Sequence, residues 1–395
     1  MPAISSEMIL EQFDIKLFLA EYWQRKPCLI KKAIDLSDEP VSPDELAGLA
    51  CEEEVESRLV RCDDTGKKWH LTHGPFSEET FLQLPPANWT LLVQAVDIWH
   101  PPVKNLKRHF RFIPDWRIDD VMVSYATDHG GVGPHFDYYD VFLLQGCGRR
   151  RWFTGGLCEA DAALMEDCEL RILEKFVPEQ EFMVESGDML YLPPRFAHQS
   201  ISEGASVCYS IGFRAPSAVE MLQGISDELS CRSGDEERYR DGEPGIPEHP
   251  GEIRRQVIAD LHQWLLQKVN DTDAIARWFG SFVTSPRYEN LRFPQPTSKT
   301  GLKAGVSGGK GLARDSHARL AFLRQESETH LFADGHRYRM TNELMPLASR
   351  LCDAQFIEAA FLAPWLKNNE ALDLLLALVN SGSLVLTDIA TDSEE

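Results

Sequence analysis

One short stretch of this chain strongly limits the fold that it can adopt. A glycine-rich turn at residues 130–133 leads through a proline into His135, Phe136 and Asp137, and an apolar segment with β-strand character follows. Successive side chains of a strand point to opposite faces, so His135 and Asp137 are expected on the same face. Of the 12 histidines in the chain, only His135 has an acidic residue two positions downstream. This pair predicts a metal-binding edge on a β-structure.

A third ligand is expected from a segment well downstream. The Gly-Asp pair at 187–188 is typical of a hairpin turn, and an alternating strand and the Pro-Pro corner at 193–194 precede His198. The rigid corner fixes the approach of His198. Two histidines and one carboxylate on one side of an ion leave open positions opposite, as in non-haem Fe(II) oxygenases. His129, in the glycine-rich turn, is a weaker rival ligand because it lacks the downstream carboxylate.

These motifs resemble the JmjC branch of the cupin superfamily of 2-oxoglutarate oxygenases. Tyr-Trp-Gln-Arg-Lys-Pro at 22–27, Gly-Val-Gly-Pro-His at 131–135 and Gly-Arg-Arg-Arg-Trp at 148–152 are similar to segments of the bacterial ribosomal oxygenases, which hydroxylate an arginine of a large-subunit ribosomal protein. The resemblance spans nearly the whole chain. It implies Fe(II), 2-oxoglutarate as cosubstrate and dioxygen, with three metal ligands, His135, Asp137 and His198.

Arg150 is the expected anchor for the cosubstrate. Strand alternation places Arg150 on the face of Trp152, and Arg149 and Arg151 on the other face. A guanidinium inside a barrel is unfavourable unless paired, and a dicarboxylate would supply a bidentate partner from outside the chain. From the residues alone, a salt-bridged surface cluster is the simpler interpretation. The resemblance implies instead that Arg150 binds the distal carboxylate of 2-oxoglutarate, with Ser124 beside it.

Short strands with period-two alternation occupy residues 119–215, the expected catalytic barrel. Strands are expected at residues 120–126, 137–145, 149–154, 181–185, 189–192 and 207–213. Such strands, separated by turn signals, indicate an antiparallel double-stranded β-helix, the cupin or jelly-roll core of JmjC proteins. Residues 1–118 are expected to form a lead-in that packs on this barrel. Together with the helices beyond the barrel, the pattern predicts an α+β fold.

Helical spacing replaces strand alternation beyond the barrel. Residues 216–293 have amphipathic helical patterns, and the resemblance implies that they form a homodimer, although periodicity alone equally allows them to pack on their own barrel. Residues 294–312 are rich in proline and glycine, which predicts a linker. Residues 313–395 carry helices and a hairpin-like segment at 380–386, which predicts a winged-helix-like domain. This domain has no dense basic face, so direct nucleic-acid binding is not expected.

The charge balance limits the possible partners. The chain has 40 Lys and Arg against 62 Asp and Glu, a net charge of −22. This favours a cationic partner such as a basic ribosomal protein over nucleic acid or an anionic membrane. The nine cysteines include no C-x-x-C pair, so they suit neither a disulfide framework nor a thiolate zinc site. No secretory signal pattern and no bilayer-length apolar run is visible, so a cytoplasmic location is expected.

The leading hypothesis is an Fe(II)- and 2-oxoglutarate-dependent hydroxylase of an arginine side chain in a large-subunit ribosomal protein. Three alternatives remain open. The enzyme could hydroxylate another residue such as histidine, or remove an N-methyl group, because these reactions differ only in which C–H bond approaches the metal. The chain could be a non-catalytic metal-binding cupin that acts as an interaction module. A cupin dioxygenase without a keto acid would not depend on Arg150.

Overall fold

The computed structural model describes residues 9–388, except 11, 37–39, 64–67, 167, 233, 235, 241–245, 247, 289–290 and 292–293. The ends of the expected lead-in and winged-helix-like domain, residues 1–8 and 389–395, lie outside this description. The chain divides into two compact units, Met1–Ala215 and Pro216–Glu395. This division coincides with the expected end of the barrel. Within the described ranges, we find no helix with the length and apolar composition that a membrane span requires.

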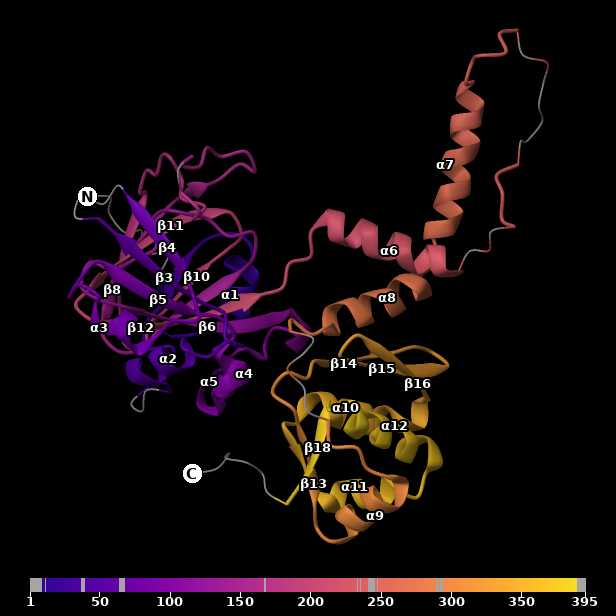
Figure 1. Ribbon diagram of the computed structural model, residues 1–395. Helices are drawn as coiled ribbons and strands as arrows, with labels where there is room; N and C mark the ends of the chain where they lie inside the picture. Colours follow the sequence, from indigo (N-terminus) through magenta and orange to yellow (C-terminus); the bar gives the residue numbers. More distant parts are fainter. Residues whose placement is uncertain are drawn as a thin grey trace. The chain divides into compact units, whose positions relative to one another are not determined.

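Two β-sheets form the first unit (Figure 1). The larger has nine strands in the order β1-β2-β10-β7-β12-β6-β5-β3-β4, and the smaller has the order β11-β8-β9. Apart from the parallel pair β1 and β2, neighbouring strands are antiparallel. The strands are β1 (Ile9–Leu10), β2 (Cys28–Ile30), β3 (Ser57–Cys62), β4 (Trp69–His73), β5 (Trp89–Val93), β6 (Ile118–Ala126), β7 (Val141–Gln145), β8 (Arg149–Leu157), β9 (Gln180–Glu185), β10 (Met189–Leu192), β11 (Phe196–Glu203) and β12 (Ser206–Phe213).

The two sheets pack face to face around an apolar core. Val141 and Leu143 of β7 join Trp152 of β8 and Phe182 of β9 in one buried cluster. The intervening residue Phe142 points to the other face and joins a core that includes residues of the helices. This two-layered antiparallel arrangement is the barrel predicted from the strand pattern. The helices of this unit are α1 (Ile15–Glu21), α2 (Pro43–Leu49), α3 (Glu78–Leu82), α4 (Val96–Trp99) and α5 (Pro101–Leu106).

The N-terminal segment does more than pack on the barrel, which corrects the expected role of residues 1–118. Strand β2 pairs with β10, and β5 pairs with β6. The described N-terminal strands therefore extend the larger sheet on both sides of the predicted barrel strands. The partners of β2 and β5 lie far away in the chain, so local sequence does not reveal these pairings.

Two barrel strands differ from those expected. The strand predicted at residues 137–145 begins only at Val141, and β11 was not predicted. In β11 the buried positions are Ala197, His198, Ser200 and Ser202, and the alternating ones, His198, Ser200 and Ser202, are polar. Because these inward-facing residues are polar, β11 lacks the apolar alternation that identifies a half-buried strand.

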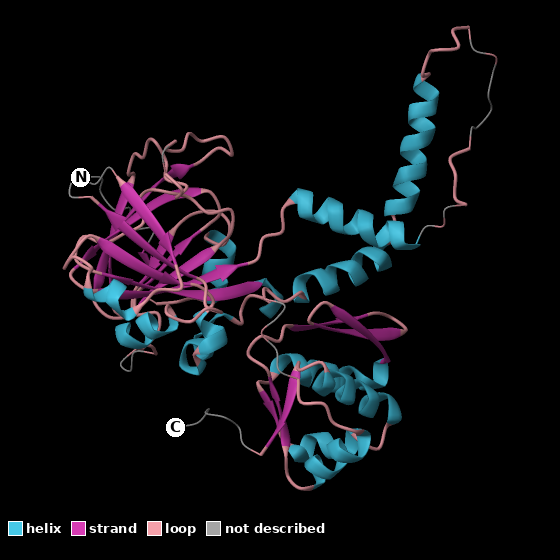
Figure 2. Cartoon of the chain, in the orientation of Figure 1, coloured by secondary structure: helices cyan, strands magenta, loops and turns pink. Residues whose placement is uncertain are grey.

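Helices and two small sheets form the second unit (Figure 2). The sheets have the orders β17-β13-β18 and β14-β15-β16. The elements are α6 (Ala218–Arg232), α7 (Arg255–Val269), α8 (Thr272–Thr284), α9 (Lys299–Ser307), β13 (Gly311–Arg314), β14 (Leu320–Arg324), β15 (Glu328–Ala333), β16 (His336–Thr341), α10 (Met345–Asp353), β17 (Phe356–Ile357), α11 (Ala359–Trp365), α12 (Asn369–Asn380) and β18 (Leu384–Thr387).

The linker expected at residues 294–312 is wrong for most of its length. The Ser298 side chain accepts a hydrogen bond from the backbone at the start of α9 and caps this helix. Leu302 and Val306 lie one helical turn apart, and both are buried in the core of the second unit together with Leu312 of β13. The apolar pair at helical spacing, rather than the glycine and proline content, determines the structure here.

The hairpin expected at residues 380–386 is also wrong. Strand β18 pairs with β13, which lies far earlier in the chain. An unpredicted antiparallel meander, β14 to β16, provides the other sheet. Helix α8 is closely joined to this meander, since a Cβ at Gly280 would lie 2.3 Å from the Phe332 ring. The expected boundary at residue 313 therefore separates elements that pack together.

Candidate metal and cosubstrate site

The three expected metal ligands come together in the first unit. His135 and His198 are opposite each other in an isolated antiparallel bridge. The His135 N–H donates to the His198 carbonyl at 3.0 Å, and the His198 N–H donates back at 2.8 Å. One ligand atom from each of His135, Asp137 and His198 lies within 4.8 Å of the others. Among the described residues, no other group of three or more His, Cys, Asp or Glu has such spacing.

Backbone carbonyls fix the orientation of both imidazoles. Nδ1 of His135 lies 2.9 Å from the carbonyl oxygen of Gly133, and Nδ1 of His198 lies 2.9 Å from that of Phe196. Because a carbonyl oxygen only accepts, each Nδ1 carries the proton and each Nε2 keeps its lone pair. Two such nitrogens and the Asp137 carboxylate form a donor set that fits a divalent first-row metal ion.

The environment of His198 keeps this ligand neutral. Burial lowers the pKa of His198 to about 4, with a further lowering by His135 and an opposing effect of Asp137. A metal ligand must be deprotonated, so this shift makes the Nε2 lone pair available at neutral pH. Asp137 Oδ2 lies 3.7 Å from His198 Nε2.

Close contact between backbones explains the glycine-rich turn. The turn lies against β11, where the His129 N–H donates to the Ser202 carbonyl and the Ser202 N–H donates to the Gly130 carbonyl, both at 2.9 Å. A Cβ at Gly131 would lie only 2.2 Å from the Ser200 carbonyl oxygen. Glycine allows this approach because it has no side chain. The turn thus acts as an added strand that brings His135 opposite His198.

Arg150 lies inside the barrel on the same face as Trp152, as predicted, and both side chains are buried. Its Nε donates to Ser206 Oγ at 2.8 Å and its Nη1 donates to Ser124 Oγ at 2.8 Å. Nη2 donates to the carbonyls of Ser124 and Ser206, at 2.9 and 3.2 Å. A guanidinium has five N–H groups, so one on Nη1 remains. This differs from the open bidentate fork that the sequence suggested.

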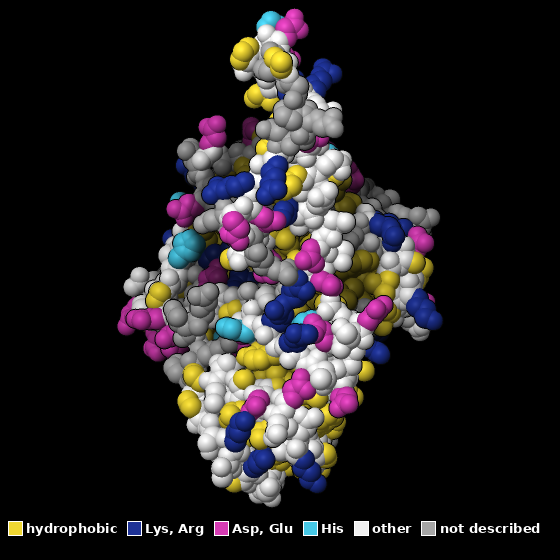
Figure 3. Space-filling view, turned by 90° about the vertical axis from the view of Figure 1, so that its right-hand side faces the viewer, with side chains coloured by type: hydrophobic (Ala, Val, Ile, Leu, Met, Phe, Trp, Pro, Cys, Tyr) yellow, Lys and Arg dark blue, Asp and Glu magenta, His cyan; other side chains and the backbone are white. Residues whose placement is uncertain are grey.

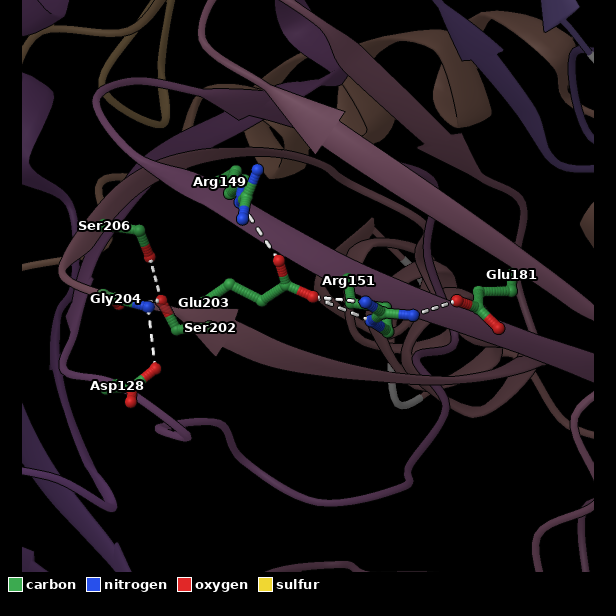
Figure 4. Close-up of polar contacts among 8 residues, drawn as sticks. All are labelled: Asp128, Arg149, Arg151, Glu181, Ser202, Glu203, Gly204 and Ser206. Atoms are coloured by element: carbon green, nitrogen blue, oxygen red, sulfur yellow. Dashed lines mark hydrogen bonds and ion pairs between the residues drawn. The ribbon is translucent and has the colours of Figure 1, made fainter.

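No carboxylate of the described chain forms an ion pair with Arg150. Burial lowers the pKa of this guanidinium. On the opposite face of β8, Arg149 lies 3.0 Å from Glu203, and Arg151 contacts both Glu203 and Glu181 (Figure 4). The interpretation as a salt-bridged surface cluster therefore holds for Arg149 and Arg151. The inner arginine is a buried cation with no anionic partner among the described residues.

Comparison with known proteins shows which family has this arrangement. A JmjC domain model matches residues 105–221, and a ROXA-like winged-helix model matches residues 262–385. Over 371 residues the chain is 36% identical to ribosomal protein uL16 3-hydroxylase from Escherichia coli (strain K12), which covers 92% of this chain and 95% of that protein. The chain belongs to the JmjC ribosomal oxygenase family.

Two further comparisons support this membership. A probable ribosomal oxygenase from Haemophilus influenzae is 31% identical and matches 93% of both chains. The structure of the E. coli ribosomal oxygenase YcfD in complex with cobalt and 2-oxoglutarate has a TM-score of 0.83 and 36% identity, and covers 95% of this chain and 98% of that chain. The α+β fold, with a JmjC cupin core and a C-terminal winged helix, is confirmed. The winged-helix match includes α8, which agrees with the packing of α8 on the meander.

Arg195 is a residue of this ribosomal oxygenase site that the sequence did not reveal. Its backbone has a φ of 69°, a left-handed conformation that is unusual outside glycine. The Arg195 N–H donates to the Asp137 carbonyl at 2.6 Å, and Nε donates to the Cys158 carbonyl at 2.8 Å. The Pro-Pro corner before it was the available signal, because a rigid corner fixes the position of the next residues. Arg195 thus joins the Asp137 segment to the end of β8.

Four other residues near the candidate site differ in their burial and contacts. Ser124 is buried and contacts Arg150. His129 is not part of the three-ligand group, and its side chain is 69% exposed beside Asp128. Tyr138 and Tyr139, which directly succeed Asp137, are 46% and 43% exposed, so they are not core residues.

Proposed function

We propose that this chain is an Fe(II)- and 2-oxoglutarate-dependent hydroxylase of an arginine side chain in the ribosomal protein uL16. The observation that carries this proposal is the convergence of His135, Asp137 and His198 in the same barrel as a buried guanidinium for which the described residues provide no anionic partner. A metal ion and a diacid together satisfy both features. The proposal is supported by the E. coli relative, which is named a uL16 3-hydroxylase, and by the cobalt and 2-oxoglutarate complex of YcfD.

The chain's own residues then have distinct tasks. His135, Asp137 and His198 hold Fe(II), which together with 2-oxoglutarate and dioxygen supplies the oxidising power to hydroxylate an unactivated C–H bond. The Nδ1 hydrogen bonds keep both imidazoles in one tautomer and orientation. Arg150 binds the distal carboxylate of the cosubstrate. The buried Trp152 ring, with its centroid 6.1 Å from that of His198, excludes water from this side of the site.

The substrate is proposed to be a basic protein. The net charge of −22 favours association with a cationic partner over nucleic acid. The exposed rings of Tyr138 and Tyr139 lie next to Asp137 in the chain and are the proposed contacts for the target side chain. Because the proposed substrate is a ribosomal protein, the proposed location is the cytoplasm.

We further propose that α6 and α7 form a homodimer interface. In α7 no described residue is buried. Large apolar side chains on these helices are exposed, among them Leu222 (69%) and Leu265 (49%). In Figure 3 hydrophobic side chains are visible at the surface of the upper part, the height at which α7 lies in Figure 1. Light scattering tests this: Leu265→Asp should give a monomer, whereas Leu82→Asp, at an equally apolar but isolated exposed position, should leave the dimer intact.

The decisive experiment is mass spectrometry of recombinant uL16 after incubation with the enzyme, Fe(II) and 2-oxoglutarate. The expected product carries one added oxygen atom on an arginine, and Asp137→Ala forms none. Oxygen on a histidine instead, or loss of a methyl group, would support the other enzymatic alternatives. If the protein releases no succinate and leaves uL16 unmodified, the interaction-module alternative is favoured.

A further inference from the structure

The hydrogen bonds around Arg150 continue into a chain of hydroxyl groups. Ser206 Oγ, which accepts from Arg150 Nε at 2.8 Å, lies 2.6 Å from Ser202 Oγ. Ser202 Oγ in turn lies 2.7 Å from the Gly204 carbonyl oxygen. Both serines are completely buried. Figure 4 shows Ser202 near the end of β11 and Ser206 at the start of β12, on either side of the turn that contains Gly204.

The donor and acceptor roles in this series of hydrogen bonds follow from the single proton that each serine hydroxyl carries. A carbonyl oxygen only accepts, so the single hydroxyl proton of Ser202 points to Gly204. Ser202 therefore accepts in its contact with Ser206, and Ser206 donates. The bonds run in one direction, from Arg150 through Ser206 and Ser202 to the carbonyl of Gly204. In such an arrangement each bond polarises and strengthens the next.

The far end of the chain is held in place as well. Gly204 has a φ of 78°, and its N–H donates to Asp128 Oδ1 at 2.7 Å. The Ser202 backbone also forms the two hydrogen bonds to the glycine-rich turn that leads to His135. Ser202 therefore contacts both the glycine-rich turn, which leads to His135, and strand β8, which carries Arg150.

The acceptors that the described part of the chain provides for the guanidinium are all electrically neutral. Two hydroxyl groups and two carbonyls satisfy four of its five N–H groups without cancelling the positive charge. A carboxylate at the position of Ser206 would orient Arg150 equally well but would neutralise it. The neutral acceptors leave the whole charge for an incoming diacid. A buried cation of this kind attracts an anion strongly because little water screens it.

We propose that Ser206 and Ser202 are positioning residues for the cosubstrate. Ser206 fixes the plane of the Arg150 guanidinium so that its remaining Nη1 N–H meets the distal carboxylate. Ser202 orients the Ser206 hydroxyl by accepting its proton. This inference rests on the proposed use of 2-oxoglutarate, and it adds two residues to those expected from the sequence.

The test measures binding of 2-oxoglutarate to Mn(II)-loaded protein by calorimetry, without turnover. Ser206→Ala should raise the Kd for 2-oxoglutarate about 10- to 100-fold, because a charge-assisted bond is lost. Ser202→Ala, which keeps the bond between Arg150 and Ser206, should raise it about 3-fold. Ser206→Thr keeps the hydroxyl and should restore most of the affinity. Ser57→Ala removes a buried hydroxyl that bonds only the Ala50 carbonyl, and is the matched control.

Kinetics separate positioning from general damage. For Ser206→Ala the KM for 2-oxoglutarate should rise more than kcat falls at saturating cosubstrate, and the affinity for Mn(II) should stay unchanged. A wild-type Kd for 2-oxoglutarate in Ser206→Ala overturns the inference but leaves the proposed function intact. Absence of 2-oxoglutarate binding in the wild type overturns the proposed function itself. If Ser206→Ala does not fold, Ser202→Ala provides the test. An unchanged Kd for 2-oxoglutarate in Ser202→Ala would then refute the proposed role of the two serines.

Discussion

Replacing Gly131 by alanine should separate the glycine-rich turn from β11. A Cβ at this position would lie 2.2 Å from the Ser200 carbonyl oxygen, whereas real Cβ atoms essentially never approach closer than 3.0 Å. The backbones must therefore move apart by at least 0.8 Å, the difference between these distances. The two hydrogen bonds between the turn and Ser202, now 2.9 Å long, would lengthen beyond bonding distance. At about 0.5–1.5 kcal/mol each, their loss should lower the free energy of unfolding by about 1–3 kcal/mol.

Urea unfolding followed by circular dichroism measures this loss, and Mn(II) titration measures its effect on the metal site. Because His135 lies just beyond the turn, Gly131→Ala should also weaken Mn(II) binding. Gly48→Ala is the matched control, since nothing lies within 4 Å of its added Cβ in helix α2. This variant should gain about 0.5–1 kcal/mol in stability and bind Mn(II) normally. A Gly131→Ala protein as stable as the wild type would refute the close contact of turn and strand.

Three further predictions address the site and the second unit. Arg150→Met should raise the Kd for 2-oxoglutarate roughly 10- to 150-fold in calorimetry, whereas Arg149→Met on the outer face should leave it unchanged. Asp137→Ala should abolish succinate release and weaken Mn(II) binding, and a variant that still releases succinate would exclude Asp137 as a required ligand. Burial lowers the pKa of His330 below its ordinary value of 6.5, although the nearby Glu328 carboxylate raises it in part. As the pH falls, the unfolded chain therefore protonates this histidine before the folded protein does. The urea-unfolding stability should therefore fall as the pH drops through about 6.5, and His330→Gln should show a smaller fall.

The proposed site residues could be singled out in the sequence because their signals are local. His135 and Asp137 lie two positions apart, and Arg150 and Trp152 share a strand face by the same alternation. Ser124 was expected beside Arg150 from the family resemblance, but the other two serines of this network gave no signal. Ser202 and Ser206 are ordinary residues in sequence, and their proposed role depends on the hairpin that places the Ser206 hydroxyl beside Arg150 and the Ser202 hydroxyl beside Ser206.

Glycine was the least reliable guide in the second unit. Glycines at residues 305 and 311 suggested a flexible linker, but they are positions of close packing. A Cβ at Gly305 would lie 2.5 Å from Leu386, and one at Gly311 would lie 2.3 Å from Phe356. Sequence composition does not distinguish a glycine that confers flexibility from one that makes room for a neighbouring side chain, because the neighbour is distant in sequence.

The pairing of β8 with β11 places both halves of the site on one inner face. Thr154, Trp152 and Arg150 lie opposite His198, Ser200 and Ser202, in that order. A slip of one residue would turn every one of these β11 side chains outward, away from the metal ligands and from the guanidinium. An irregularity next to this stretch, where β8 advances three residues and β11 advances two, absorbs an extra residue in the glycine pair at 155–156. The register, rather than any single motif, therefore couples the position of the proposed metal ligand His198 to that of Arg150, the proposed cosubstrate anchor.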